Sequence, residues 1–143
     1  MALVKDVVAC RELYSVEPRL TVSEVAHRMA ELHVGAIMVI DSGELKGIFS
    51  ERDFMVRVVV GGRDPGTTLV GEVMTANVFT VDECVSMEEA METMRIHNCR
   101  HLPVTSGDTV AGLLSMRDLM NFALEQKTEE LHHMRAYIHG SGG

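Results

Sequence analysis

The sequence has no apolar run approaching the roughly 20 residues that a membrane-spanning helix needs. Its first ten residues include Lys5 and Asp6 and lack a continuous apolar stretch, so no secretory leader is expected. Positive charge is also scarce, because 13 Lys and Arg stand against 21 Asp and Glu, a formal net charge of -8. Non-specific binding to nucleic acid or to an anionic membrane requires a basic surface. These absences predict a cytoplasmic protein whose partners are neither membranes nor nucleic acids.

Cysteine is rare as well, since Cys10, Cys84 and Cys99 are widely spaced and odd in number. The chain contains no Cys-x-x-Cys pair, and its seven His residues are scattered rather than set at zinc-finger spacing. We therefore expect reduced, structural thiols and no metal site. No Ser/His/Asp or Cys/His set for nucleophilic catalysis can be located either, so we predict that the protein is not an enzyme.

What the sequence does contain is an internal repeat. Segments 47–53 and 112–118 both read Gly, two apolar residues, Ser, any residue, Arg, Asp, and the second begins 65 positions after the first. The same offset pairs Glu24 with Glu89. The chain is therefore a tandem duplication. A half of this 143-residue chain is too small to bury a sufficient core alone, so the two halves are expected to fold together.

Each half shows the same order of predicted elements. Segments 21–24 and 86–89 fit the Ser/Thr-x-x-Glu capping box, which predicts a helix start at the same place in both repeats. Two short apolar runs separated by turn residues then predict a β-hairpin in each half. Ser50 and Ser115 are candidate caps of a further helix. The predicted hairpin strands are 36–40, 45–49, 102–104 and 110–114, and the predicted later helices are 55–60 and 119–125.

The domain boundaries follow from this order. A Gly/Pro cluster at 61–66 cannot continue a helix and marks the linker between the repeats. We expect a first repeat over 1–62, a second over 63–125, and a C-terminal part over 126–143. Within that last part, 126–138 is predicted to be a solvated helix and 140–143 to be flexible. The fold class is α/β (α+β).

The repeated phrase offers groups that bind nucleotides. A Ser at a strand-to-helix corner lies beside unpaired amides at the positive end of a helix dipole, which favours phosphate. Arg52 or Arg117 can add a charge-assisted hydrogen bond. Asp53 or Asp118 can accept hydrogen bonds from vicinal ribose hydroxyls. Helix capping alone would explain a single copy, but two copies with the same Arg and Asp favour a nucleotide site.

The duplicated phrase, the apolar hairpin before it, Arg100-His101-Leu102-Pro103-Val104 and Val73-Met74-Thr75 resemble a tandem pair of CBS domains, named after cystathionine β-synthase. The resemblance covers roughly residues 4–124. It implies two pseudo-twofold-related β-α-β-β-α CBS repeats packed as one module, with two clefts for adenosine-containing ligands. The tail at 129–138 resembles that of small stand-alone CBS-pair proteins of bacteria and plant organelles. Such modules usually pair into a disc-shaped homodimer.

The resemblance also assigns roles to residues. Asp53 and Asp118 would bind the ribose, and Ser50, Arg52, Ser115 and Arg117 would bind phosphates. The expected adenine slot consists of Tyr14, Ser15, Gly35, Ala36, Ile37, Phe79, Thr80, His101 and Leu102. The first repeat departs from the pattern, because Gly35, Ala36 and Met38 replace Arg100, His101 and Pro103. We therefore expect two unequal clefts, with the one that Arg100 faces preferring the more highly phosphorylated ligand.

The implied function is a non-catalytic regulatory sensor. AMP, ADP, ATP or NAD(H) would bind as a regulatory ligand, shift the two repeats, and so signal to a regulated partner protein. S-adenosylmethionine also contains adenosine, so the sequence leaves the ligand open. Two other classes stay open: an interaction adaptor with vestigial clefts, and a nucleotide-processing enzyme. An absence of response to every adenosine ligand would favour the adaptor, whereas product formation would favour the enzyme.

Overall fold

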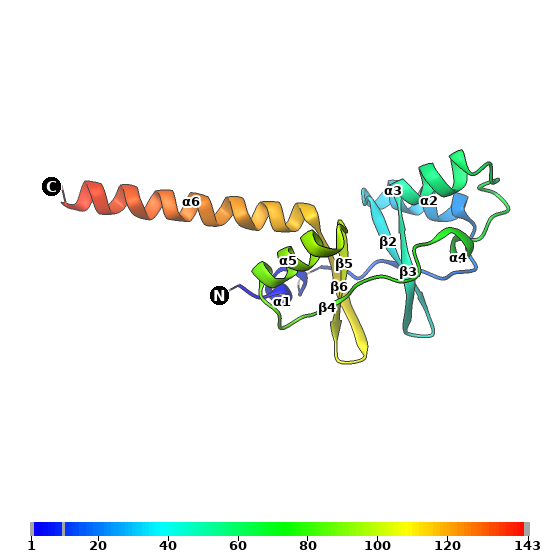
Figure 1. Cartoon of the computed structure of the whole chain (residues 1–143), viewed down its shortest axis with the longest axis horizontal. Coiled ribbons are helices and arrows are strands. Elements are labelled where there is room, and N and C mark those ends of the chain that lie inside the picture. Colours follow the sequence, from blue (N-terminus) through cyan, green and yellow to red (C-terminus); the bar gives the residue numbers. More distant parts are fainter. Residues whose placement is uncertain (1, 10, 142–143) are drawn as a thin grey trace.

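The computed structural model describes residues 2–9 and 11–141, the last three by their backbone alone. The chain forms two three-stranded sheets that lie side by side (Figure 1). The first contains β1 (Ser15–Val16), β2 (Ala36–Asp41) and β3 (Glu44–Ser50), and the second contains β4 (Val81–Asp82), β5 (His101–Ser106) and β6 (Thr109–Ser115). In each sheet the first two strands are parallel and the last two antiparallel. The predicted α+β fold, with the same strand order in both repeats, is confirmed.

The first long helix of each repeat begins where its capping residue predicts. Helix α2 (Val22–Leu32) follows Thr21, and α5 (Met87–His97) follows Ser86. Each cap hydroxyl accepts a hydrogen bond from the backbone amide three residues later, at 3.2 Å and 3.1 Å. This contact satisfies one of the free amides at the helix start, which is why both helices begin at these residues.

The second helices of the two repeats differ from each other. In the first repeat, α3 (Glu51–Asp53) continues directly into the π-helix η1 (Phe54–Val60). In the second, α6 (Met116–Ser141) is one continuous helix of 26 residues. Both therefore begin directly after the capping Ser, four and three residues before the predicted starts at 55 and 119. The hydrogen bonds that Ser50 and Ser115 accept account for this earlier start.

The predicted solvated helix at 126–138 is part of α6 and not a separate element. No Gly or Pro between 119 and 138 interrupts the helical backbone, so the two predicted helices merge. The backbone of Gly140 and Ser141 is also part of this helix, and the flexibility expected of these two residues stays a prediction. The rest of that expectation, Gly142 and Gly143, and the prediction for Cys10 lie outside the described residues. No helix in the described part of the chain has both the length and the apolar character to cross a membrane.

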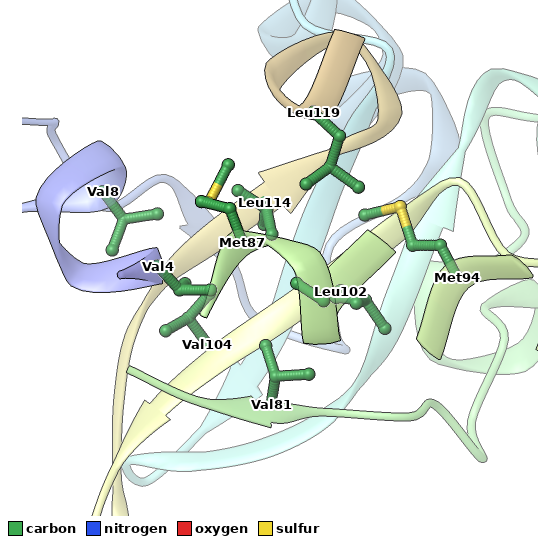
Figure 2. Packing of buried hydrophobic residues seen from close by; sticks show 10 residues of the cluster. Val4, Val8, Val81, Met87, Met94, Leu102, Val104, Leu114 and Leu119 are labelled. Carbon is green, nitrogen blue, oxygen red and sulfur yellow. The ribbon is translucent and has the colours of Figure 1, made fainter. Parts of the chain in front are cut away.

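Each hydrophobic core includes a short helix from elsewhere in the sequence. Helix α1 (Val4–Val8) places Val4 and Val8 among the buried residues of the second repeat (Figure 2). Helix α4 (Val70–Val73), which follows the linker, packs in the core of the first repeat. The two halves therefore cannot separate without exposing both cores. The division of the sequence at residues 62 and 63 remains a prediction.

A third hydrophobic cluster joins the two sheets. Ala36, Met38 and Ile48 are buried there, with Val110 and Leu113 of β6 packed against them. Because side chains alternate along a strand, these residues face the other sheet while their neighbours face the helices. The two sheets are thus held in contact, and the start of each hairpin lies close to the other repeat.

Candidate functional site

A cavity of about 1190 Å³ lies between the two repeats. Its wall comes from the segment between α1 and β1, the end of α2, the starts of β2 and β5, the end of β6 and the start of α6. This size is sufficient for a nucleotide. Eight of the predicted site residues line it: Tyr14, Gly35, Ala36, Arg100, His101, Ser115, Arg117 and Asp118. The fold therefore brings the phrase of the second repeat together with the expected adenine-slot residues of the first.

The second-repeat phrase caps α6 at the cavity wall. The hydroxyl of Ser115 accepts a hydrogen bond from the amide of Asp118 at 3.2 Å, and Asp118 Oδ2 accepts one from the amide of Ser115 at 2.8 Å. Capping and cavity lining are thus compatible roles for the same two side chains. Since the capping contact leaves Oδ1 of Asp118 without a bond from Ser115, the carboxylate can accept a further donor from the cavity side.

Arg11 supplies that further donor in the structure. Its Nη2 donates to Asp118 Oδ1 at 2.6 Å, and its Nη1 donates to Oδ2 at 2.9 Å, a bidentate pair. The Asp118 side chain is only 10% exposed, whereas Arg11 is 46% exposed. Burial tends to raise the pKa of the Asp118 carboxyl, but the hydrogen bonds from Arg11 and Ser115 outweigh it, so the pKa lies below its usual value. The hydrogen bond with Asp118 also raises the pKa of Arg11.

Sequence reasoning missed this contact, because Arg11 looked like an ordinary surface charge beside Glu12. The two partners are 107 positions apart. No periodic or local sequence pattern predicts a contact between residues so far apart. The repeat could not mark it either, since the position 65 residues after Arg11 is Ala76.

The remaining charges of the cavity are mixed in sign. Arg100, Arg117 and His101 line one part, and Glu12 and Glu51 add negative charge to the wall. Burial lowers the pKa of His101, although the nearby Asp118 carboxylate acts in the opposite direction. His101 is therefore neutral at pH 7 and can gain a proton when an anion approaches.

The side chains of the first-repeat phrase, 47–53, make different contacts from those of the second. Asp53 is only 9% exposed, and its carboxylate accepts hydrogen bonds from the hydroxyls of Ser50 at 3.1 Å and Thr75 at 3.2 Å. Arg57 Nε lies 3.7 Å from Oδ1 of Asp53. Neither this cavity nor a smaller one beside the hairpin turns is lined by Ser50, Arg52 or Asp53. The two copies of the phrase are thus unequal, with the first engaged in internal contacts.

The other expected adenine-slot residues lie elsewhere. Ile37 and Leu102 are 1% and 0% exposed, so their side chains pack in the two cores and do not line the slot as expected. The reason is the alternation of a strand, because Ala36 and His101 next to them face the cavity. Ser15 pairs with Met38 inside the first sheet.

A smaller cavity of about 480 Å³ beside the hairpin turns includes Phe79 and Thr80. The ring of Phe79 stacks on that of His97, with 3.5 Å between the ring centroids. These two slot residues are therefore separated from the larger cavity. Among the described residues, no group of three or more His, Cys, Asp or Glu side chains is placed to hold a metal ion. Cys84 and Cys99 are free thiols, and burial raises the pKa of Cys99.

Two curated proteins are similar to most of this chain. The CBS domain-containing protein YhcV of Bacillus subtilis is 35% identical over 130 residues, which cover 91% of this chain and 89% of that protein. The mitochondrial CBS domain-containing protein CBSX3 of Arabidopsis thaliana is 34% identical over 125 residues, 84% of this chain. The alignment spans only 61% of the length of the Arabidopsis protein.

Two solved structures have the same fold. A protein with CBS domains from Burkholderia ambifaria is 33% identical with a TM-score of 0.82, covering 87% of this chain and 95% of that one. A CBS domain protein from Pyrobaculum aerophilum, solved in complex with AMP, is 27% identical with a TM-score of 0.73, covering 81% of this chain and 88% of that one. The CBS domain family model matches twice, over residues 4–60 and 70–125. The chain therefore belongs to the CBS-domain family and carries two copies of the domain in tandem.

Proposed function

We propose that this chain is a non-catalytic regulatory module that binds an adenosine-containing ligand in the cavity between its two CBS repeats. The observation that carries the proposal is the meeting, in one cavity, of Ser115, Arg117 and Asp118 with Arg100 and His101. Hydroxyl, guanidinium and carboxylate groups on one wall match a ribose phosphate. The AMP complex of the Pyrobaculum aerophilum protein supports this choice of ligand class.

In this proposal the ligand has one orientation. Its phosphates lie toward Arg100, Arg117 and the amides at the start of α6, where positive charge and the helix dipole favour an anion. The ribose hydroxyls donate to Asp118. The adenine lies beside Tyr14, Gly35 and Ala36 on the first-repeat side. Candidate ligands are AMP, ADP, ATP, NAD(H) and S-adenosylmethionine, which share adenosine; all of them except S-adenosylmethionine also carry phosphate.

Arg11 couples ligand binding at Asp118 to a change in conformation. A ribose that donates to Asp118 competes with the guanidinium of Arg11 for the same two oxygens. Arg11 lies between Val8, buried in the second core, and β1 of the first sheet, so its displacement acts on the segment that connects the two repeats. The coupling between ligand and shape is limited to the ligand's differential affinity for the two states, typically about 1–3 kcal/mol. A regulated partner protein would respond to this change.

The module forms a homodimer, which presents the same changed surface twice to its partner, and it works in the cytoplasm. An interaction adaptor with vestigial clefts is the second candidate. It is favoured by the internal contacts that already occupy Asp53 and by the Arg11 pair on Asp118.

A thermal-shift titration against AMP, ADP, ATP, NAD, NADH and S-adenosylmethionine tests the function. A ligand that binds only the native state stabilises it by about 2.7 kcal/mol at a hundredfold excess over Kd, which raises Tm measurably. We expect Asp118→Asn to abolish the ligand-induced rise, and the matched variant Asp53→Asn to retain it, because Asp53 is engaged internally. Each rise is measured from the Tm of the same variant without ligand.

Two outcomes would contradict this expectation, and a further variant tests the role of Arg100. No rise with any of the six compounds would favour the adaptor. A rise lost in Asp53→Asn but kept in Asp118→Asn would place the ligand at the other copy of the phrase. If Arg100 sets the preference for phosphorylated ligands, Arg100→Ala lowers the affinity for ATP more than for AMP, and an unchanged ratio of the two Kd values would remove that role.

The affinity for a phosphorylated ligand is expected to increase as the pH falls from about 8 to about 6. The pKa of His101 lies below its usual value in the ligand-free protein, and a nearby phosphate raises it by favouring the imidazolium form. Binding therefore takes up a proton, and each unit of pKa rise corresponds to about tenfold in affinity. Calorimetry in buffers of different ionisation enthalpy measures this uptake. His101→Gln should remove both the uptake and the pH dependence, and a wild-type Kd independent of pH would contradict the prediction.

A further inference from the structure

The outer part of α6 is exposed along its length. Every residue from Ala123 to Ile138 is exposed, whereas Leu119 and Phe122 near the helix start pack on the second core. Figure 1 shows the helix leaving the body of the molecule and projecting alone. Isolated helices of about 12–15 residues are marginal in water. A partner that covers this segment would supply the missing stability.

One face of this helix carries a stripe of apolar side chains. Met120, Leu124, Leu131 and Met134 are 60%, 64%, 54% and 59% exposed. Their spacings of four, seven and three residues fit the d and a positions of a heptad repeat, in which Lys127 takes the intervening d position. The next a position is Ile138. In the same repeat, Leu119 and Phe122 take c and f positions, so the stripe lies on the side of the helix that faces away from the core.

We propose that this stripe binds the same stripe of a second copy of the chain, forming a parallel, two-stranded coiled coil. The charges beside the stripe favour this arrangement. In a parallel pair, a g residue of one helix meets the e residue five positions later in its partner. Glu130 is at g and Arg135 is at e, so the twofold axis creates two attractive Glu130–Arg135 pairs. In an antiparallel pair g meets g and e meets e, and neither charge finds an opposite one.

Lys127 affects both the strength and the register of the proposed contact. As the one charged side chain within the stripe, it must extend its ammonium group to water past the seam, which weakens the contact. A polar residue in the seam also penalises registers shifted by one heptad, in which it would lie against Met120 or Met134. The proposed contact is therefore specific and moderate in strength. It specifies one contact of the homodimer proposed above and does not depend on ligand binding.

Sedimentation of the full chain over a concentration series tests the contact. We expect Leu131→Asp to weaken dimerisation at least tenfold, because it places two carboxylates in the seam. Lys127→Leu should strengthen dimerisation. Glu130→Arg should weaken it and the double variant Glu130→Arg/Arg135→Glu should restore it, whereas the control Glu129→Arg, at an outward f position, should leave it unchanged. A wild-type chain that stays monomeric, or a Leu131→Asp chain that dimerises like the wild type, would overturn the proposal.

Cross-linking then tests the parallel direction. In a background with Cys10, Cys84 and Cys99 replaced by Ser, Leu124→Cys lies away from the middle of the stripe, so it is expected to form a disulfide between two parallel copies under mild oxidation, and Glu129→Cys is not. Equal cross-linking of the two variants would refute the parallel seam. The thermal shift by adenosine ligands is measured on Leu131→Asp in parallel. A retained ligand shift with lost dimerisation separates the coiled coil from the ligand site, so either proposal can fail without the other.

Discussion

Replacing Phe49 by Ala is expected to lower the free energy of unfolding by about 3–5 kcal/mol. Phe49 is 0% exposed and lies on β3 in the middle of the first core. Removal of the ring loses the free energy gained by transferring it from water into the core. It also leaves a cavity that the surrounding strands and helices can only partly fill. Because a domain is typically stable by only about 5–15 kcal/mol, the variant is expected to be close to unfolding at 37 °C.

Urea denaturation at an unchanged m-value measures this loss. Phe79→Ala provides the matched control, because Phe79 is 48% exposed and its main contact is the stack on His97. We expect the control to cost about 1 kcal/mol. If the two variants lost equal stability, the assignment of Phe49 to the core would be wrong.

Val4→Asp is expected to destabilise the second repeat by about 4 kcal/mol or more, although Val4 is near the beginning of the chain. Val4 is 0% exposed and lies among core residues that come mostly from 81–119. A carboxylate there has neither water nor an opposite charge, and an unpaired buried charge is among the few single changes of this size. The substitution therefore tests whether α1 belongs to the core that is distant from it in sequence.

Lys5→Asp is the control for this variant, since it places the same side chain on the exposed side of α1 and should change stability by no more than about 0.5 kcal/mol. Hydrogen exchange locates the effect. Amides of β5 and β6 should lose protection before those of β2 and β3. Early loss in β2 and β3 would instead assign α1 to the first repeat.

The elements that sequence reasoning predicted well depend on neighbours along the chain. The helix caps at Thr21 and Ser86, the hairpins and the Ser-x-x-Asp contacts all form within a few residues, so residue type and spacing suffice to predict them. The fold family was indicated by the resemblance of the duplicated phrase and its neighbouring motifs to a tandem pair of CBS domains, and the family model confirms it. Helix ends were less certain, since α6 continues from Met116 through a predicted boundary at 125 that nothing in the sequence enforces.

The sequence by itself determined the two repeats and their strand and helix order, and it indicated the side chains that we propose for the ligand site. Only the tertiary structure decided how these parts combine. It made the two copies of the phrase unequal, because Thr75 and Arg57 meet Asp53 while Arg11 meets Asp118. The reason is physical: contacts between segments far apart in the chain are set by how the two sheets and their covering helices pack, and such packing leaves no periodic signal in the sequence.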